Sequence, residues 1–123
     1  MILGLGTDLV EIARIHGVRE RHGARFERRI LTEAEFREYA ERNGCVAYLA
    51  KRFAVKEAVA KALGTGMRGS VQWRTIEVVS DDLGRPECRL IGDAARYTQG
   101  KKLTVTITDE RAYALAFAIY HNA

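Results

Sequence analysis

The sequence has little of what marks a specialised class of protein. Among its 123 residues are one proline and two cysteines, and 29% of the residues are charged. This composition excludes a disulfide-rich scaffold and a disordered chain. No apolar run approaches the roughly 20 residues needed to span a bilayer. We therefore expect a soluble globular protein with a single domain over residues 1–123.

Signals for export are also missing. The first segment, MILGLGTDLVEI, has no basic region or cleavage site, and Asp8 and Glu11 interrupt it. The spacing of Cys45 and Cys88 matches no metal or redox motif. We expect both thiols to be reduced and the protein to be cytoplasmic, with no membrane partner.

Positive charge is what the sequence has in excess. The formal net charge is +4, and six arginines fall within one early stretch. A basic surface suits an anionic partner. The pattern leaves open whether nucleic acid, a phosphate-rich ligand, an acidic protein or only solvent faces it. The six are Arg14, Arg19, Arg21, Arg25, Arg28 and Arg29.

Local patterns in the first half predict a strand followed by helices. Residues 2–12 alternate as a strand does, and residues 13–30 favour a helix. Thr32 and Glu35 form a capping box that opens a helix ended by Gly44. Residues 45–63 predict a long, alanine-rich helix that stops at Gly64.

The second half is typical of strands. This order predicts an α+β fold in which a mainly antiparallel sheet packs against the long helix. The residues after position 108 predict a hairpin. The expected strands are 71–80, 87–91, 102–108 and 112–120, with a short helix between Gly92 and Gly100.

Two carboxylates fall where a core is expected. Both faces of the strand at 2–12 are largely apolar, which predicts an inner strand with Asp8 pointing into the core. At about 100° per residue, Glu57 lies in the middle of an apolar stripe of the long helix. A buried, unpaired carboxylate costs several kcal/mol or stays protonated. Either the two carboxylates share a divalent cation, or Asp8 caps a turn and Glu57 pairs with Lys61.

Oxygen ligands alone favour a hard cation, and two carboxylates without a third ligand suit Mg²⁺, which takes further ligands from water and phosphates. Arg52, Lys56 and Lys61 lie within about one turn of Glu57. The segment Gly64–Gly66 either approaches a phosphate or only ends the helix. Together these parts suit phosphoryl transfer, which depends on positioning and charge neutralisation.

Two motifs resemble those of a known family. GLGTDLVEIARI is similar to the signature G-x-D-x-x-E-x-x-R-I of the holo-acyl-carrier-protein synthases, which are small 4′-phosphopantetheinyl transferases. FAVKEAVAKALGTG is similar to their second signature, F-x-x-K-E-A-x-x-K-A-x-G-T-G. The stretches RFERRIL and VVSDDLGRP also match family positions, so the resemblance covers nearly the whole chain.

The resemblance implies an activity and its partners. The enzyme would move the phosphopantetheine arm of coenzyme A to a serine of apo acyl carrier protein, for fatty acid biosynthesis. Adenosine 3′,5′-bisphosphate would be released, and Mg²⁺ would be required. The family is trimeric, with active sites between subunits, and no nucleic acid partner is implied.

By motif position, the resemblance also assigns residues. Asp8 and Glu57 would bind Mg²⁺ and, with Lys61 at the phosphate, form the catalytic set. Further contacts to coenzyme A would come from Arg52, Gly64, Thr65, Gly66 and Thr108. The carrier protein would dock on Arg14, Arg21 and Arg25.

One position departs from the family. Many relatives have a histidine where TITD places Asp109, so an imidazole contact to the nucleotide is absent, while Thr106 and Thr108 retain hydroxyls. The group that removes the serine proton stays open between a metal-bound water and Glu57, with Lys61 suitable only if its pKa were strongly lowered. A nucleic-acid-binding module and a structural trimer without activity are the rival interpretations.

Overall fold

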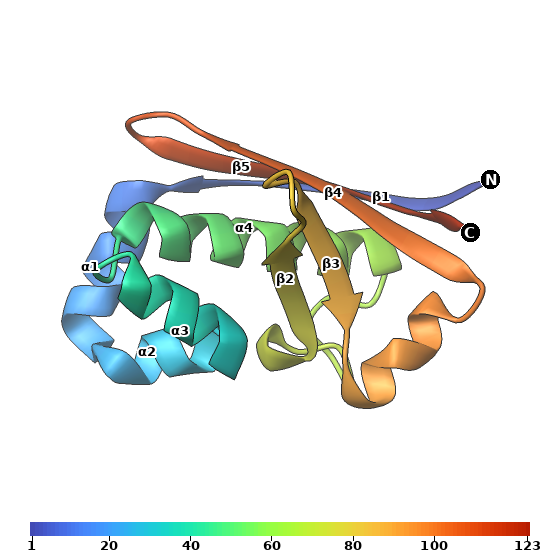
Figure 1. Ribbon diagram of the computed structural model, residues 1–123, viewed down its shortest axis with the longest axis horizontal. Coiled ribbons are helices and arrows are strands. Elements are labelled where there is room, and N and C mark those ends of the chain that lie inside the picture. The colour runs from blue at the N-terminus through green and yellow to red at the C-terminus, as the bar shows by residue number, and fades with distance from the viewer.

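The computed structural model describes residues 1–123 as helices around a central helix, with two antiparallel sheets (Figure 1). The α+β class is confirmed, but the strands form a three-stranded sheet, β1-β5-β4, and a separate pair, β2-β3, where the sequence predicted one sheet. The elements are β1 (Ile2–Glu11), α1 (Ile12–His22), α2 (Ala24–Ile30), α3 (Glu33–Glu41), α4 (Val46–Leu63), η1 (Trp73–Thr75), β2 (Ile76–Ser80), β3 (Pro86–Leu90), η2 (Gly92–Thr98), β4 (Lys101–Asp109) and β5 (Tyr113–Asn122).

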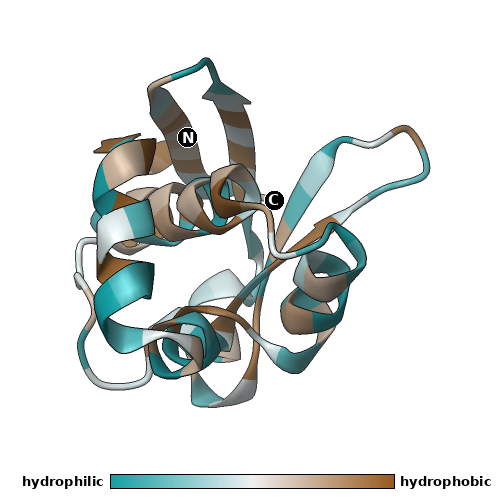
Figure 2. Cartoon of the chain, turned by 90° about the vertical axis from the view of Figure 1, so that its left-hand side faces the viewer, coloured by the Kyte–Doolittle hydropathy of each residue, from teal (hydrophilic) through white to brown (hydrophobic).

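Helix α4 forms the centre of the core. The three-stranded sheet lies along one side of it, and α1, α2, α3 and the β2–β3 pair lie around its other sides (Figure 1). Viewed along α4, its hydrophobic residues occupy the middle of the molecule, and the β2–β3 hairpin projects away from the body (Figure 2). Alanines make this close packing possible, since Ala50, Ala54, Ala58 and Ala60 are almost completely buried.

Two glycines let β1 lie directly on α4. A methyl carbon at Gly6 would lie 1.9 Å from the carbonyl oxygen of Ala58, and one at Gly4 would lie 1.9 Å from that of Ala62. Only a residue without a side chain allows this approach of the two backbones. The glycines of GLGTD therefore set the distance between the strand that bears Asp8 and the helix.

Strand β1 is an edge strand, and the prediction of an inner strand is wrong. It pairs only with β5, and its odd face is exposed, with Leu5 at 56% and Leu9 at 62% of their full accessible area. Strand β1 is therefore apolar on both faces although no part of this chain covers its odd face. The even face, which bears Asp8, packs toward α4 as expected.

Other boundaries differ from the prediction where turns intervene. The helix expected at 13–30 is two helices, broken at Gly23, whose φ of 57° ends α1. The strand expected from residue 71 begins at Ile76, because η1 precedes it. The short helix after Gly92 is a 3₁₀ helix, η2.

Local signals of capping and termination are confirmed. Thr32 and Glu35 form both hydrogen bonds of the capping box of α3, and Gly64 ends α4 with a left-handed φ of 78°. Both cysteines are free thiols. None of the helices has the length and apolar character required to cross a bilayer.

Candidate active site

Asp8, Glu57 and Lys61 meet where β1 crosses α4. Asp8 lies opposite Ala116 of β5, on the face of the sheet that packs against α4. The ammonium of Lys61 lies 3.2 Å from Oδ1 of Asp8 and donates a hydrogen bond of 2.9 Å to the carbonyl of Thr7. Glu57 precedes Lys61 by one helical turn, so the three side chains share one side of α4.

The pKa of Glu57 is shifted by its burial and by the charges around it. Burial raises the pKa of Glu57, and the carboxylate of Asp8 raises it further, whereas Lys61 and Arg14 act in the opposite direction. The carboxylates of Asp8 and Glu57, partly compensated by Lys61 and Arg14, supply oxygen ligands for a cation. No group of three histidine, cysteine, aspartate or glutamate side chains forms a fuller ligand set. A metal held here would take its other ligands from water or substrate, as Mg²⁺ does.

Glu57 does not face the core, and that expectation is wrong. Helix α4 is buried on nearly all sides, and the stripe that contains Glu57 is the least buried. Phe53 and Glu57 are half-buried on this stripe, and Lys61 is exposed. The carboxylate therefore lies at an opening, where substrate can reach it.

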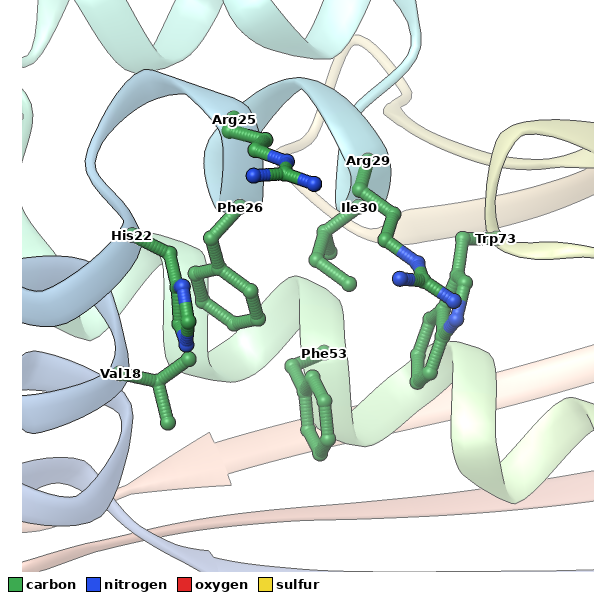
Figure 3. Close-up of a pocket in the computed structure, with 8 residues that line it drawn as sticks. All are labelled: Val18, His22, Arg25, Phe26, Arg29, Ile30, Phe53 and Trp73. Atoms are coloured by element: carbon green, nitrogen blue, oxygen red, sulfur yellow. The ribbon is translucent and has the colours of Figure 1, made fainter.

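A cleft begins one turn before Glu57 (Figure 3). Its volume is about 520 Å³, and α1, α2, α4 and η1 line it. Phe53 and Trp73 stack with ring centroids 4.9 Å apart, and Arg25 and Arg29 lie at the rim. Since Phe53 and Glu57 are four residues apart, the cleft lies about 6 Å along α4 from the carboxylate. The lining residues are Val18, His22, Arg25, Phe26, Arg29, Ile30, Phe53 and Trp73.

Comparison with known proteins shows which family has this site. Residues 4–118 match the 4′-phosphopantetheinyl transferase superfamily. The chain belongs to this superfamily. The resemblance seen in the two sequence motifs is thus confirmed.

Relatives of this superfamily match the chain over nearly its full length. The holo-[acyl-carrier-protein] synthase of Photorhabdus laumondii is 54% identical over 121 residues, which cover 96% of each chain. The crystal structure of the synthase from Neisseria meningitidis has a TM-score of 0.92 at 42% identity, and covers 99% of this chain and 100% of that one. A synthase from Bacillus anthracis, solved in complex with CoA (3′,5′-ADP), has a TM-score of 0.82 at 32% identity and covers 100% and 99% of the two chains.

The arginines of this superfamily member divide into two groups. Arg19 donates hydrogen bonds to the Tyr39 hydroxyl at 2.9 Å and the Gly44 carbonyl at 2.6 Å, and Arg28 lies 4.3 Å above the Phe36 ring. These two hold the helices together. The arginines without such a contact are Arg14, Arg21, Arg25 and Arg29, and all four are exposed. Of the three expected to dock a partner, Arg25 lies at the cleft and Arg14 near Glu57. Arg29 is a rim residue that sequence reasoning missed.

Arg52 occupies a second pocket, about 140° around α4 from Glu57. The pocket has a volume of about 220 Å³, and Arg42 and Lys51 also line it. Arg52 is only 6% exposed, its Nε has no hydrogen-bond partner, and its guanidinium lies 4.5 Å above the ring of Tyr48. Asp109 lies in the same pocket, 3.6 Å from Lys51. The Arg52 guanidinium also lies 4.0 Å from Oε1 of Glu38, so the group is paired, and its buried Nε is the atom left for a ligand to bind.

Two residues expected near Glu57 lie elsewhere. Thr108 is on the outer face of the sheet, opposite Leu115, whereas Asp8 is on the inner face. Lys56 is completely buried on another side of α4. Adjacent helix positions differ by about 100°, so the basic residues that are close in sequence diverge in space. The segment Gly64–Gly66 ends α4 just beyond Lys61, where the sequence predicted it.

Proposed function

We propose that the chain transfers the 4′-phosphopantetheine group of coenzyme A to a serine of an apo acyl carrier protein. The reaction releases adenosine 3′,5′-bisphosphate and serves fatty acid biosynthesis in the cytoplasm. The observation that carries this proposal is the meeting of the Asp8 and Glu57 carboxylates with Lys61, at the end of a cleft with a basic rim. A cation site beside phosphate ligands is what phosphoryl transfer requires.

Asp8 and Glu57 hold Mg²⁺ in this proposal. Their oxygen donors fit a hard cation, and the effect of the Asp8 carboxylate on the pKa of Glu57 supports a shared ion by placing the two groups close together. When bound, the ion neutralises charge on the pyrophosphate of coenzyme A. Glu57 and Asp8 fix the position of the ion from two different elements, so the β1–α4 contact determines where the phosphates bind.

Lys61 binds a phosphate oxygen. Its side chain is 53% exposed and its ammonium already lies beside Asp8, so a small rotation brings the ammonium to a substrate at the opening. Gly64, Thr65 and Gly66 follow directly and border the nucleotide half. As the serine oxygen attacks, negative charge shifts to the leaving phosphate, and an ammonium positioned in advance stabilises that charge.

The carrier protein docks at the cleft of Figure 3. The rim supplies Arg25, and Arg14 and Arg21 extend the positive surface along α1. The aromatic floor accepts an apolar side chain, while the arginines attract an acidic helix. The serine then lies near Glu57, because cleft and carboxylate are one helical turn apart.

The active enzyme is a homotrimer in this proposal. The outer face of the three-stranded sheet exposes several large apolar residues, and β1 has an unpaired edge. Such a surface marks an interface. Thr108 and the Arg52 pocket face away from Asp8 and Glu57, so one coenzyme reaches both only if a neighbouring subunit supplies them. The exposed apolar residues of this face include Leu3, Leu5, Leu9, Tyr113, Leu115 and Phe117.

The experiment is a transfer assay with the purified protein. Coenzyme A, Mg²⁺ and an apo acyl carrier protein are added, and the mass of the carrier protein is measured by mass spectrometry. We expect the carrier to gain one phosphopantetheine group, and the gain to vanish with a chelator or when the acceptor serine is alanine. A carrier that stays unmodified, or a gain that survives the chelator, rules out the proposed function.

A further inference from the structure

Lys56 is a buried charge that the proposed reaction does not use. Its side chain has no accessible surface, although it is the residue next to Glu57. Its ammonium donates three hydrogen bonds, to the carbonyl of Ile30 at 2.7 Å, to Oε1 of Glu35 at 2.6 Å and to the carbonyl of Trp73 at 2.8 Å. An ammonium has three donors, so all of them are used.

Glu35 completes this buried pair from α3. Its Oε1 accepts a hydrogen bond from the Thr32 amide at 2.8 Å, and its Oε2 accepts one from the Val78 amide at 2.8 Å. Burial lowers the pKa of Lys56, and the charge of Glu35 opposes that shift. The pair thus joins α2, α3, η1 and β2 to one point on α4. A buried ion pair adds little net stability, but its hydrogen bonds fix the positions of the elements that it joins.

Two of the bonded carbonyls belong to the cleft. Ile30 ends α2 and Trp73 begins η1, and both residues line the cavity. Figure 3 shows the side chains of Ile30 and Trp73 near Phe53, on the opposite side of the cavity from α1. Phe53 lies three residues before Lys56, and the stacking of its ring on Trp73 depends on where η1 is held. One ammonium therefore sets the spacing of α2, η1 and α4.

We propose that the Lys56–Glu35 pair is a positioning device for the carrier-protein cleft, which holds the walls at Ile30 and Trp73 at the spacing that admits the partner's apolar side chain. This inference rests on the proposed function, since it assumes that the carrier docks there. Without the ammonium, both carbonyls lose their donor and the two walls move independently. Lys56 touches no substrate, so it acts only through the cleft.

The test removes both charges together. In Lys56→Met with Glu35→Gln, the methionine fills the volume and the amide still accepts a hydrogen bond, so the interior has no unpaired charge. Trp73 is the only tryptophan, and it reports the cleft by fluorescence. We expect a red-shifted emission with stronger acrylamide quenching. The KM for carrier protein should rise about tenfold while the KM for coenzyme A stays within about twofold.

A matched control is Tyr120→Phe. It also removes a hydrogen bond to a main-chain carbonyl, the partly buried bond to that of Tyr97, but Tyr120 and Tyr97 do not line the cleft. Its Trp73 emission and carrier KM should equal those of the wild type. A folded double variant with unchanged emission and unchanged carrier KM overturns the proposal, as does an equal rise in both KM values.

Should the double variant fail to fold, Lys56→Arg provides the second test. The guanidinium keeps the charge beside Glu35, but its planar geometry cannot meet both carbonyls in the positions that the ammonium uses. We expect the same selective rise in carrier KM, and an unchanged value overturns the proposal. Wild-type enzyme that modifies the carrier while these variants show no shift refutes this inference alone; wild-type enzyme without activity refutes the proposed function.

Discussion

Two lysine–carboxylate groups on α4 share the same chemistry and differ in how completely they are paired. At the core, Lys56 and Glu35 use their hydrogen-bonding capacity on each other and on the backbone. At the opening, Lys61 pairs with Asp8, whereas Glu57 forms no ion pair. A lysine–carboxylate group whose hydrogen bonds are all satisfied fixes the structure around it. A group with an unpaired carboxylate leaves an interaction that a ligand can supply.

The largest expected effect is a loss of stability when the Lys56–Glu35 group in the core is broken. Lys56→Met alone leaves the Glu35 carboxylate buried without its cation, so we expect a loss of about 3–5 kcal/mol in the free energy of unfolding. The matched variant at the opening, Lys61→Met, should change stability by less than about 1 kcal/mol, because that pair is solvated. Urea denaturation measures both, and equal losses would contradict the distinction between the two groups.

The next effect separates activity from stability at the opening. Glu57→Gln removes a ligand of the proposed cation, so we expect the transfer rate to fall by about 10²–10³-fold. The folded state should become no less stable, because the substitution removes a carboxylate that burial and Asp8 disfavour. Glu33→Gln, at an exposed position of α3, is the control and should change neither quantity. An unfolded or fully active Glu57→Gln protein would refute this interpretation.

A third variant tests the backbone contact that brings the opening group together. Gly6→Ala places a methyl carbon against the Ala58 carbonyl, so we expect stability to fall by about 1–3 kcal/mol and activity to fall as Asp8 moves away from Glu57. Gly17→Ala is the control, since only the flexible Arg21 side chain lies near and a helix favours alanine by about 0.5–1 kcal/mol. Thermal unfolding distinguishes them, and a stable Gly6→Ala protein would contradict the packing.

The smallest effect concerns pH. The pKa of Glu57 is raised in the folded state, so between the ordinary glutamate value and the raised value the folded protein binds more protons than the unfolded chain. The contribution of Glu57 to stability therefore falls as pH rises through this window. Without metal, the wild type should lose stability relative to Glu57→Gln over that range, and urea titrations at several pH values measure it. A difference that grows in the opposite direction would contradict the shift.

Much of the fold could be predicted because its signals are local. The capping box at Thr32, the stop at Gly64 and the final hairpin each depend on neighbouring residues, and each is confirmed. The position of β1 depends on which strands pair, and apolar residues on both faces did not reveal that one face stays open. Tertiary packing decides such questions, and local patterns do not record it.

The sequence predicted which residues form the candidate site better than it predicted how they are arranged in space. Asp8 and Glu57 were identified because a carboxylate among apolar neighbours is costly, and the structure brings them together with Lys61. The burial of Lys56 and its pairing with Glu35 were not foreseen, because they depend on what surrounds that side of α4. The cleft was missed because its aromatic residues come from three separate elements.

The pairing of β1 with β5 has a consequence for how the enzyme is made. The hydroxyl of Thr7 donates a hydrogen bond to the carbonyl of Ala116, which is 109 positions later in the chain. Asp8 lies in the same pair of strands, opposite Ala116. Contacts between such distant segments are slow to form, and during synthesis the later one does not yet exist. Glu57 and Lys61 therefore leave the ribosome and fold into their helix before the strand of Asp8 has a partner. In the proposed function, the cluster of Asp8, Glu57 and Lys61 is among the last parts of the molecule to assemble, so we expect a nascent chain without β5 to lack the cation site.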